Sequence, residues 1–171
     1  GAHVGDGVYV TGTLGDAAAG LRQTLSKAAG DPDLLERLHR PTPRVEQGLI
    51  LRGRASACID VSDGLAADLG HICDASGVAA QVDADALPAS SVLAATFDAP
   101  TRREFQLAGG DDYELCFTAP DAVASDLLRE LADSGCAATR IGRIVAGANV
   151  DVHDASGNLV SVPRRGWEHF A

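Results

Sequence analysis

Positive charge and long apolar runs are both scarce in this sequence of 171 residues. Lys27 is the sole lysine, and the formal net charge is −10 at pH 7. Nucleic acids and anionic membranes both require a basic surface, so we expect neither as a partner. No run of about eighteen apolar residues occurs, which argues against a transmembrane helix.

The cysteines lack the spacing that a metal site or a disulfide framework requires. They are Cys58, Cys73, Cys116 and Cys136, and no two of them form a Cys-x-x-Cys pair. We therefore predict buried, reduced thiols in a cytoplasmic protein. The first residues also lack the basic and apolar regions of a signal peptide, which agrees with a cytoplasmic location.

The sequence does hold enough apolar residues for one core. Hydrophobic residues make up 46% of the chain, and the mean hydropathy is +0.03. A chain of this length fits one domain, so we expect a single domain over residues 1–171. Its first expected strand begins close to residue 1, as if the chain were cut at a domain boundary.

Apolar periodicity predicts alternating strands and helices. We expect strands at 8–13, 56–61, 78–82 and 113–118, with short strands within 138–162. We expect helices at 16–29, 32–39, 45–51, 65–76, 90–96, 101–107 and 123–131. Asp31 is a candidate N-cap for the second helix, with Pro32 at its first position. This order predicts an α/β (α+β) fold in which helices cover a mixed β-sheet.

The sharpest motif is Asp60-Val61-Ser62-Asp63-Gly64, where a buried strand is expected to pass into a helix. Ser62 or Asp63 is suited to cap that helix, and Gly64 permits close approach of a ligand or another backbone. A helix N-terminus suits phosphate, and two nearby carboxylates suit magnesium. On its own, however, the motif is slightly more typical of an ordinary helix cap than of a site.

A second acidic motif reads Gly109-Gly110-Asp111-Asp112-Tyr113-Glu114-Leu115. An alternating strand would place Asp112 and Glu114 on one face, with Asp111 and Tyr113 on the other. Like charges packed this closely require a cation or donors to compensate them. The motif therefore indicates either a solvated acidic turn or a site for a metal or a substrate ammonium group.

Three further features are weaker. The glycine- and threonine-rich segment 5–15 suits either a phosphate cradle or a plain strand–turn–helix junction, and it lacks a P-loop lysine. Arg40 and Arg44 suit a phosphate clamp or a solvated loop. The aromatic segment 166–170 suits either a cap on the core or a platform for a ring-bearing substrate.

Together these motifs closely resemble the C-terminal domain of bacterial thiamine-monophosphate kinase, an enzyme of the aminoimidazole ribonucleotide synthetase-related superfamily. The match covers essentially the whole chain. The residues that carry it, in order, are Asp6–Asp16, Arg40–Arg44, Ile59–Leu65, Gly109–Phe117 and Gly166–Phe170.

The resemblance implies transfer of the γ-phosphoryl group of ATP to thiamine monophosphate, with Mg²⁺ ions between acidic side chains and phosphates. By the family pattern, Asp60 and Asp63 are magnesium ligands and Ser62 contacts the nucleotide. Asp111 and Trp167 contact the substrate. The roles of Asp112 and Glu114 stay open.

The family enzyme is roughly twice as long as this chain and acts as a homodimer. Its N-terminal domain, which supplies further magnesium ligands, has no counterpart here. We therefore expect the chain alone to have negligible kinase activity. Two alternatives stay open: another ATP-using synthetase of the same superfamily, and a non-catalytic domain whose acids keep it soluble.

Overall fold

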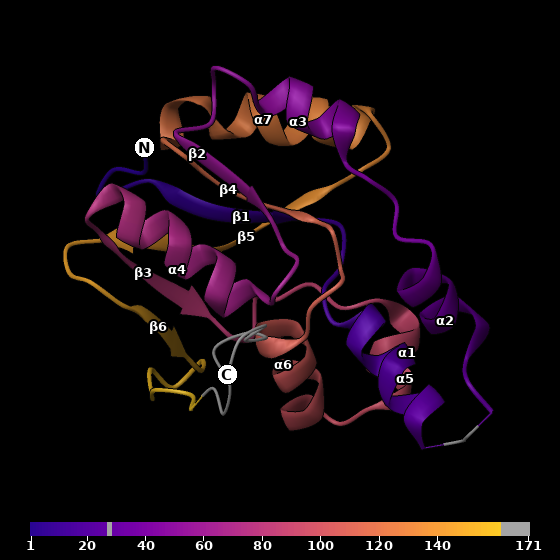
Figure 1. The fold of residues 1–171 in the computed structure, drawn as a ribbon. Coiled ribbons are helices and arrows are strands. Elements are labelled where there is room, and N and C mark those ends of the chain that lie inside the picture. Colours follow the sequence, from indigo (N-terminus) through magenta and orange to yellow (C-terminus); the bar gives the residue numbers. More distant parts are fainter. Residues whose placement is uncertain (27–28, 162–171) are drawn as a thin grey trace.

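A computed structural model describes residues 1–26 and 29–161, and it is built on one six-stranded β-sheet (Figure 1). The strand order is β2-β4-β1-β5-β3-β6. Neighbouring strands run antiparallel, except that β3 and β6 are parallel. The predicted mixed sheet is therefore confirmed. The strands are β1 (Gly7–Thr11), β2 (Ala57–Asp60), β3 (Ala79–Asp83), β4 (Leu115–Ala119), β5 (Ala138–Val145) and β6 (Val150–His153).

Helices cover both faces of the sheet and one of its ends (Figure 1). They are α1 (Asp16–Leu25), α2 (Pro32–His39), α3 (Val45–Leu51), α4 (Leu65–Ser76), α5 (Ser91–Thr96), α6 (Ala99–Ala108) and α7 (Asp121–Asp133). The core between α4 and the sheet contains Leu69 and Val10. The core on the opposite face joins α3 and α7 to the stacked rings of Tyr9 and Phe117, whose centroids are 5.1 Å apart.

The second helix has the bounds that were predicted from Asp31 and Pro32. The structure has α2 at Pro32–His39, with Pro at the first turn. The Asp31 side chain accepts a hydrogen bond from the N–H of Asp33 at 3.0 Å, as an N-cap does. Helix α1 is shorter than the 16–29 expected, since it ends at Leu25. Residues 27 and 28 lie outside the described part of the chain.

The predicted strand at 113–118 is wrong at its start, because β4 begins at Leu115. Asp111 and Tyr113 instead have φ values of +67° and +50°, in the left-handed region. The expected alternation survives for another reason: Asp112 and Glu114 are 2% and 0% exposed, while their two neighbours are exposed. The left-handed conformations of Asp111 and Tyr113, rather than a pleated strand, turn these side chains to opposite sides.

The expectation of four buried thiols is also wrong in one case. Cys73, Cys116 and Cys136 are buried, but Cys58 is exposed on the edge strand β2. All four thiols are free. Within residues 1–26 and 29–161, every helix is too short or too polar to cross a membrane.

Candidate functional site

The two acidic motifs lie side by side, although about fifty residues separate them in the sequence. The N–H of Asp111 donates to the carbonyl of Ser62 at 2.9 Å, and the N–H of Tyr113 donates to that of Val61 at 2.9 Å. In return, the N–H of Val61 donates to the carbonyl of Glu114 at 2.7 Å. These bonds extend the β2–β4 ladder beyond the strands. We call the two segments the 60–64 loop and the 109–114 loop.

Glycine permits this close contact between main chains. A Cβ atom on Gly110 would lie 2.4 Å from the carbonyl oxygen of Ser62. Gly64 has a φ of +112°, and a Cβ there would lie 3.0 Å from the backbone of Ala108. A side chain at Gly110 would push the two loops apart, since real Cβ atoms do not approach an oxygen that closely. A side chain at Gly64 would crowd the last residue of α6 and would be strained by the positive φ.

The helix after the 60–64 loop is not capped as predicted. Gly64, rather than Ser62 or Asp63, is the N-cap of α4, and as a glycine it has no side chain to cap the helix. The buried carboxylate of Asp68 instead accepts hydrogen bonds from the N–H groups of Ser62 at 2.9 Å and Asp63 at 3.0 Å. Its burial raises the pKa of Asp68, against the effect of these two bonds. Asp68 thus organises the backbone of the 60–64 loop.

An open groove of about 920 Å³ runs along both loops and α1. Ser62, Asp63 and Asp111 line its polar side. The side formed by α1 is largely apolar and includes Leu21 and Leu25, which are 43% and 74% exposed. The rest of the lining is Ala17, Ala18, Arg22, Ser26, Leu38, Ala108, Gly109, Gly110 and Tyr113. The structure therefore brings three of the predicted site residues to one groove.

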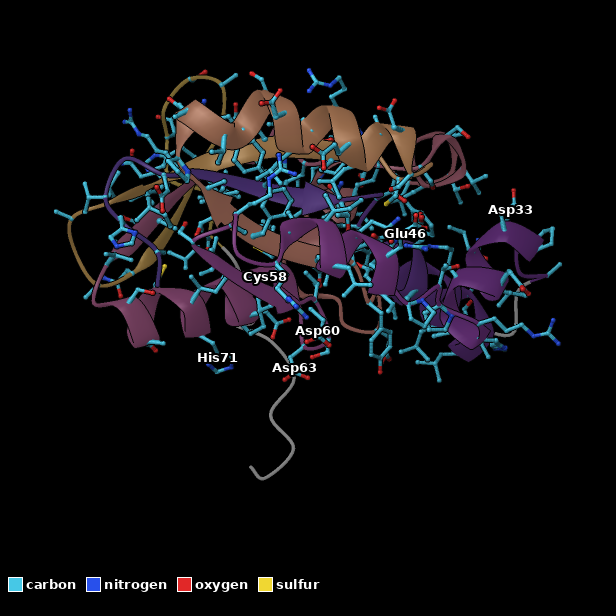
Figure 2. The ribbon with its side chains drawn as sticks, turned by 90° about the horizontal axis from the view of Figure 1, so that it is seen from above. Asp33, Glu46, Cys58, Asp60, Asp63 and His71 are labelled. Carbon is cyan, nitrogen blue, oxygen red and sulfur yellow. The ribbon has the colours of Figure 1, made fainter. Side chains whose placement is uncertain are left out.

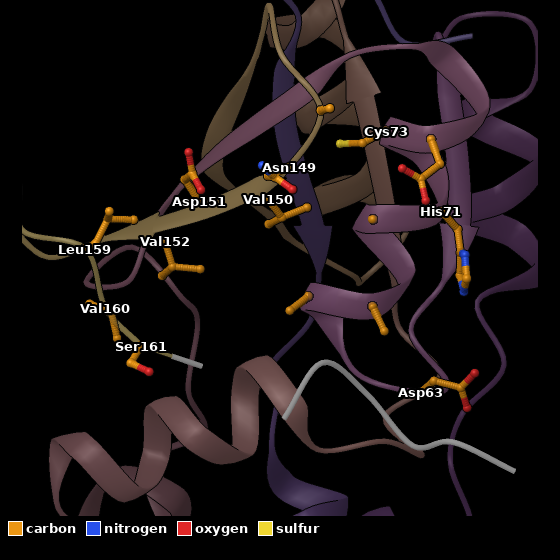
Figure 3. A pocket seen from close by; sticks show the side chains of 15 residues that line it. Asp63, His71, Cys73, Asn149, Val150, Asp151, Val152, Leu159, Val160 and Ser161 are labelled. Carbon is orange, nitrogen blue, oxygen red and sulfur yellow. The ribbon is translucent and has the colours of Figure 1, made fainter. Parts of the chain in front are cut away.

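Asp60 lies just outside this groove. It is exposed at the end of β2, and Figure 2 shows it close to Asp63 at one edge of the molecule. A second hollow, of about 640 Å³, lies between α4 and β6, and Asp63 is among its lining residues (Figure 3). Asp63 therefore borders both hollows, with His71 and Asp74 of α4 further along the second one.

Asp112 points away from the groove, toward the start of α1. Its Oδ2 accepts a hydrogen bond from the N–H of Gly15 at 2.7 Å, and its Oδ1 accepts one from Ala17 at 3.5 Å. Burial raises the pKa of Asp112 to about 7, although these bonds and Arg37 oppose the shift. A carboxylate at a helix N-terminus is favourable, because the free N–H groups there carry partial positive charge.

Glu114 is also turned inward, and arginines compensate its charge. Arg44 donates two hydrogen bonds to its carboxylate, each 2.7 Å long, and Arg37 donates one at 2.8 Å. Thr11 adds a fourth at 2.7 Å. The donors that compensate Glu114 therefore come from the chain itself. Arg44 is neither a phosphate clamp nor part of a solvated loop, whereas Arg40 is exposed.

The glycine- and threonine-rich segment 5–15 has internal partners as well. Thr13 donates to Asp16 at 2.9 Å, and Asp6 accepts a hydrogen bond from the N–H of His3 at 2.9 Å. The simple strand–turn–helix interpretation therefore fits this segment better than a phosphate cradle. Trp167, the other predicted substrate contact, lies outside the described residues.

Asp60 and Asp63 alone do not make up a complete metal site. No group of three or more His, Cys, Asp and Glu side chains is arranged to hold a metal ion within the described ranges. Mg²⁺ in phosphate sites commonly uses one or two carboxylates, together with phosphate oxygens and water. Asp60 and Asp63 fit that smaller requirement.

Sequence reasoning missed Arg37, Gly15 and Asp68, which position the two loops from elsewhere in the chain. Asp68 carried a local signal, because an acid in the first turn of a helix is suited to bind N–H groups that precede it. Arg37 and Gly15 carried none, because their partners lie 77 and 97 residues away.

Comparison with known proteins agrees with this arrangement. The family model described as AIR synthase related protein, C-terminal domain, matches residues 3–155, and the chain belongs to this family. Within it, the chain is similar to thiamine-monophosphate kinases, which confirms the resemblance seen in the sequence. The kinase of Salmonella typhimurium is 43% identical over 176 residues, which cover 100% of this chain and 54% of that protein. The kinase of Haemophilus influenzae is 47% identical, over 84% of this chain and 45% of that protein.

Solved structures show the same relationship. The thiamine-monophosphate kinase of Stenotrophomonas maltophilia K279a superposes with a TM-score of 0.85 at 46% identity, over 93% of this chain and 52% of that one. AaThiL complexed with AMPPCP and TMP superposes with a TM-score of 0.80 at 35% identity, over 99% of this chain and 53% of that one. The chain thus spans about half the length of the relatives it matches. Escherichia coli HypE, a hydrogenase maturation protein, shares the fold alone, with a TM-score of 0.73 at 20% identity.

Proposed function

We propose that this chain is the C-terminal part of a kinase that uses ATP to phosphorylate thiamine monophosphate to thiamine diphosphate. The observation that carries the proposal is the pairing of the 60–64 and 109–114 loops, which brings Ser62, Asp63 and Asp111 to one groove. The names of the relatives at 43–47% identity support the same activity. The chain supplies about half of such an enzyme, so the rest of the site comes from beyond these residues.

In this proposal, Asp60 and Asp63 hold Mg²⁺ against the phosphates of the nucleotide. Phosphoryl transfer depends mainly on positioning and on neutralising charge, and bound Mg²⁺ supplies the neutralising charge. A chain with one lysine and a net charge of −10 is suited to meet phosphate through a cation rather than directly. The hard carboxylate oxygens of Asp60 and Asp63 match the preference of Mg²⁺.

Ser62 contacts the nucleotide phosphates, and Asp111 contacts the substrate. Asp111 is exposed beside the apolar wall formed by α1, and a carboxylate in this position suits the positive thiazolium ring of thiamine. Trp167 adds a ring contact in the family pattern. No general base is required, because the acceptor is already an anionic phosphate. Asp112 and Glu114 are structural residues in this proposal, since both are buried against internal donors.

The longer protein would act as a cytoplasmic homodimer, as the family pattern implies. A different synthetase of the same superfamily is the weaker alternative. The likeness to HypE at 20% identity supports only the shared fold, whereas the kinase relatives reach more than twice that identity.

A chimera tests the proposal. This chain would replace the matching segment of the Salmonella typhimurium kinase, and the conversion of thiamine monophosphate to thiamine diphosphate would be measured with Mg²⁺ and ATP. We expect activity from the chimera and negligible activity from this chain alone. A folded chimera that turns over a different acceptor, or none, would contradict the proposed function.

Single variants of the chimera then test the site. D63A and D60A should each lower kcat/KM at least a hundredfold at fixed Mg²⁺, with partial recovery as Mg²⁺ is raised. D111A should chiefly raise KM for thiamine monophosphate. The matched control is D133A, an exposed acid at the end of α7, which should leave every constant unchanged.

A further inference from the structure

Asp112 belongs to the loop that forms one wall of the groove, and its side chain binds the helix that forms the other wall. It is part of the 109–114 loop and is 2% exposed. Its donors are the N–H groups of Gly15 at 2.7 Å and Ala17 at 3.5 Å, at the N-terminus of α1. Gly15 is the N-cap of α1 and, as a glycine, has no side chain that could cap the helix. Asp112 therefore supplies the cap of α1 from 97 residues away.

The backbone on both sides of Asp112 is held in an unusual conformation. Asp111 and Tyr113 are the two non-glycine residues with positive φ in the described ranges. This conformation is disfavoured for residues with a Cβ, above all for a large side chain such as tyrosine. Their N–H groups are fixed by the carbonyls of Ser62 and Val61. The main chain on both sides of Asp112 thus binds the 60–64 loop, while the Asp112 side chain binds the N-terminus of α1.

The placement of Asp111 follows from this arrangement. Because Asp112 is turned toward α1, the preceding carboxylate is turned outward into the groove. Helix α1 itself forms the facing wall with Ala18, Leu21 and Leu25. A change in the bond between Asp112 and Gly15 would therefore alter both the direction of Asp111 and its spacing from the apolar wall.

We propose that Asp112 is a positioning residue that fixes α1 and the 109–114 loop relative to each other, so that Asp111 faces a groove of constant width. What the groove binds rests on the proposed function. The coupling between the walls rests only on the contacts above, so the two can fail separately.

Amide hydrogen exchange of this chain tests the coupling without a ligand. In D112A, the amides of Gly15 and Ala17 should exchange at least tenfold faster, and those of Asp111 and Tyr113 should accelerate with them. D112N keeps one acceptor oxygen and should show a smaller effect at the same four amides. If D112A does not fold, D112N decides. Acceleration confined to α1 would overturn the proposal, because Asp112 would then be a helix cap only.

The control is D6N. Asp6 is also buried, at 5% exposure, and accepts bonds from the N–H of His3 and the hydroxyl of Ser56. It precedes β1, at the opposite end of that strand from Gly15. D6N should leave the four amides unchanged once its loss of global stability is subtracted.

Kinetics of the chimera test the consequence for the substrate. D112N should raise KM for thiamine monophosphate about tenfold with a smaller change in kcat, whereas D6N should leave KM unchanged. An equal rise in KM for D6N would overturn the positioning role, since general destabilisation would explain both. A chimera that is inactive with the native chain would contradict the proposed function, and the exchange measurements would still decide the coupling.

Discussion

Arg44 and Glu114 form a bidentate ion pair, in which Nε donates to Oε2 and Nη2 donates to Oε1, each at 2.7 Å. Glu114 is fully buried, and the Arg44 side chain is 17% exposed. Arg37 adds a bond to the same carboxylate. The pair joins the segment between α2 and α3 to the start of β4. The pair thereby anchors the last residue of the 109–114 loop, which also carries Asp111.

Loss of Arg44 should be costly. R44A leaves Glu114 buried with Arg37 as its remaining cationic partner among the described residues, so we expect the free energy of unfolding to fall by about 3 kcal/mol. R44K should recover only part of this, because an ammonium group cannot form the bidentate contact. Urea denaturation measures both variants.

The control for Arg44 is a neighbouring arginine. Arg40 is 79% exposed and lies 3.9 Å from Glu36, so R40A should change the free energy of unfolding by less than about 0.5 kcal/mol. If R44A were as mild as R40A, the internal pair would not support the loop as argued.

The sequence predicts those parts of the fold whose signals are local. Asp31 and Pro32 mark the start of α2, and the structure has both in those roles. The prediction of a strand at 113–118 was wrong at its start. Tyrosine is common in strands, but Tyr113 takes a left-handed conformation here. Main-chain bonds to Val61 and Ser62 impose that conformation, and such bonds are invisible in the sequence.

The candidate site, like the fold, is predictable from the sequence only in part. The acidic loops were predictable, since their residue types stand out in the sequence. Which acids face the groove was not, because the arginines that hold Glu114 and the helix that holds Asp112 are distant in the chain. The proximity of the two loops also depends on Gly110, whose role emerges only when Ser62 lies against it.

Gly110 should therefore be intolerant of a side chain. In G110A the new Cβ would meet the carbonyl oxygen of Ser62, so we expect a loss of about 1–3 kcal/mol in unfolding free energy and a faster exchange of the Asp111 amide. Gly70 is the control, because it lies within α4 with nothing within 4 Å of an added Cβ. G70A should stabilise the chain by about 0.5–1 kcal/mol, owing to the higher helix propensity of alanine. Equal effects of the two substitutions would contradict the close contact of the loops.

The thiols should differ in reactivity. Cys58 is exposed, while the other three cysteines are buried. Neighbouring groups nevertheless remove part of the solvent around the Cys58 thiol, and this desolvation, together with the carboxylate of Asp60, raises its pKa to about 11. Alkylation should therefore be slow at pH 8 and faster as the pH rises. Mass spectrometry of the native chain should find one modified cysteine, at position 58, and four after unfolding. Early modification of Cys116 would contradict the core described above.

Stability should also depend on pH through Asp112. Its pKa is raised by burial from 3.8 to about 7 in the folded chain. Between these values the folded chain holds a proton that the unfolded chain has lost. The stabilisation from this group is therefore complete below about pH 4 and is lost as the pH rises through about 7.

The D112N variant isolates this effect, because asparagine does not titrate while Asp68 and every other group remain common to both proteins. The unfolding free energy of the native chain minus that of D112N should fall as the pH rises from 4.5 to 7, by up to about 1.4 kcal/mol per pH unit. It should level off above pH 7, once Asp112 is ionised in the folded chain. Urea denaturation of both proteins at pH values from 4.5 to 8 measures the difference. A difference that stays constant with pH would mean that the N–H groups of Gly15 and Ala17 keep the carboxylate ionised despite its burial.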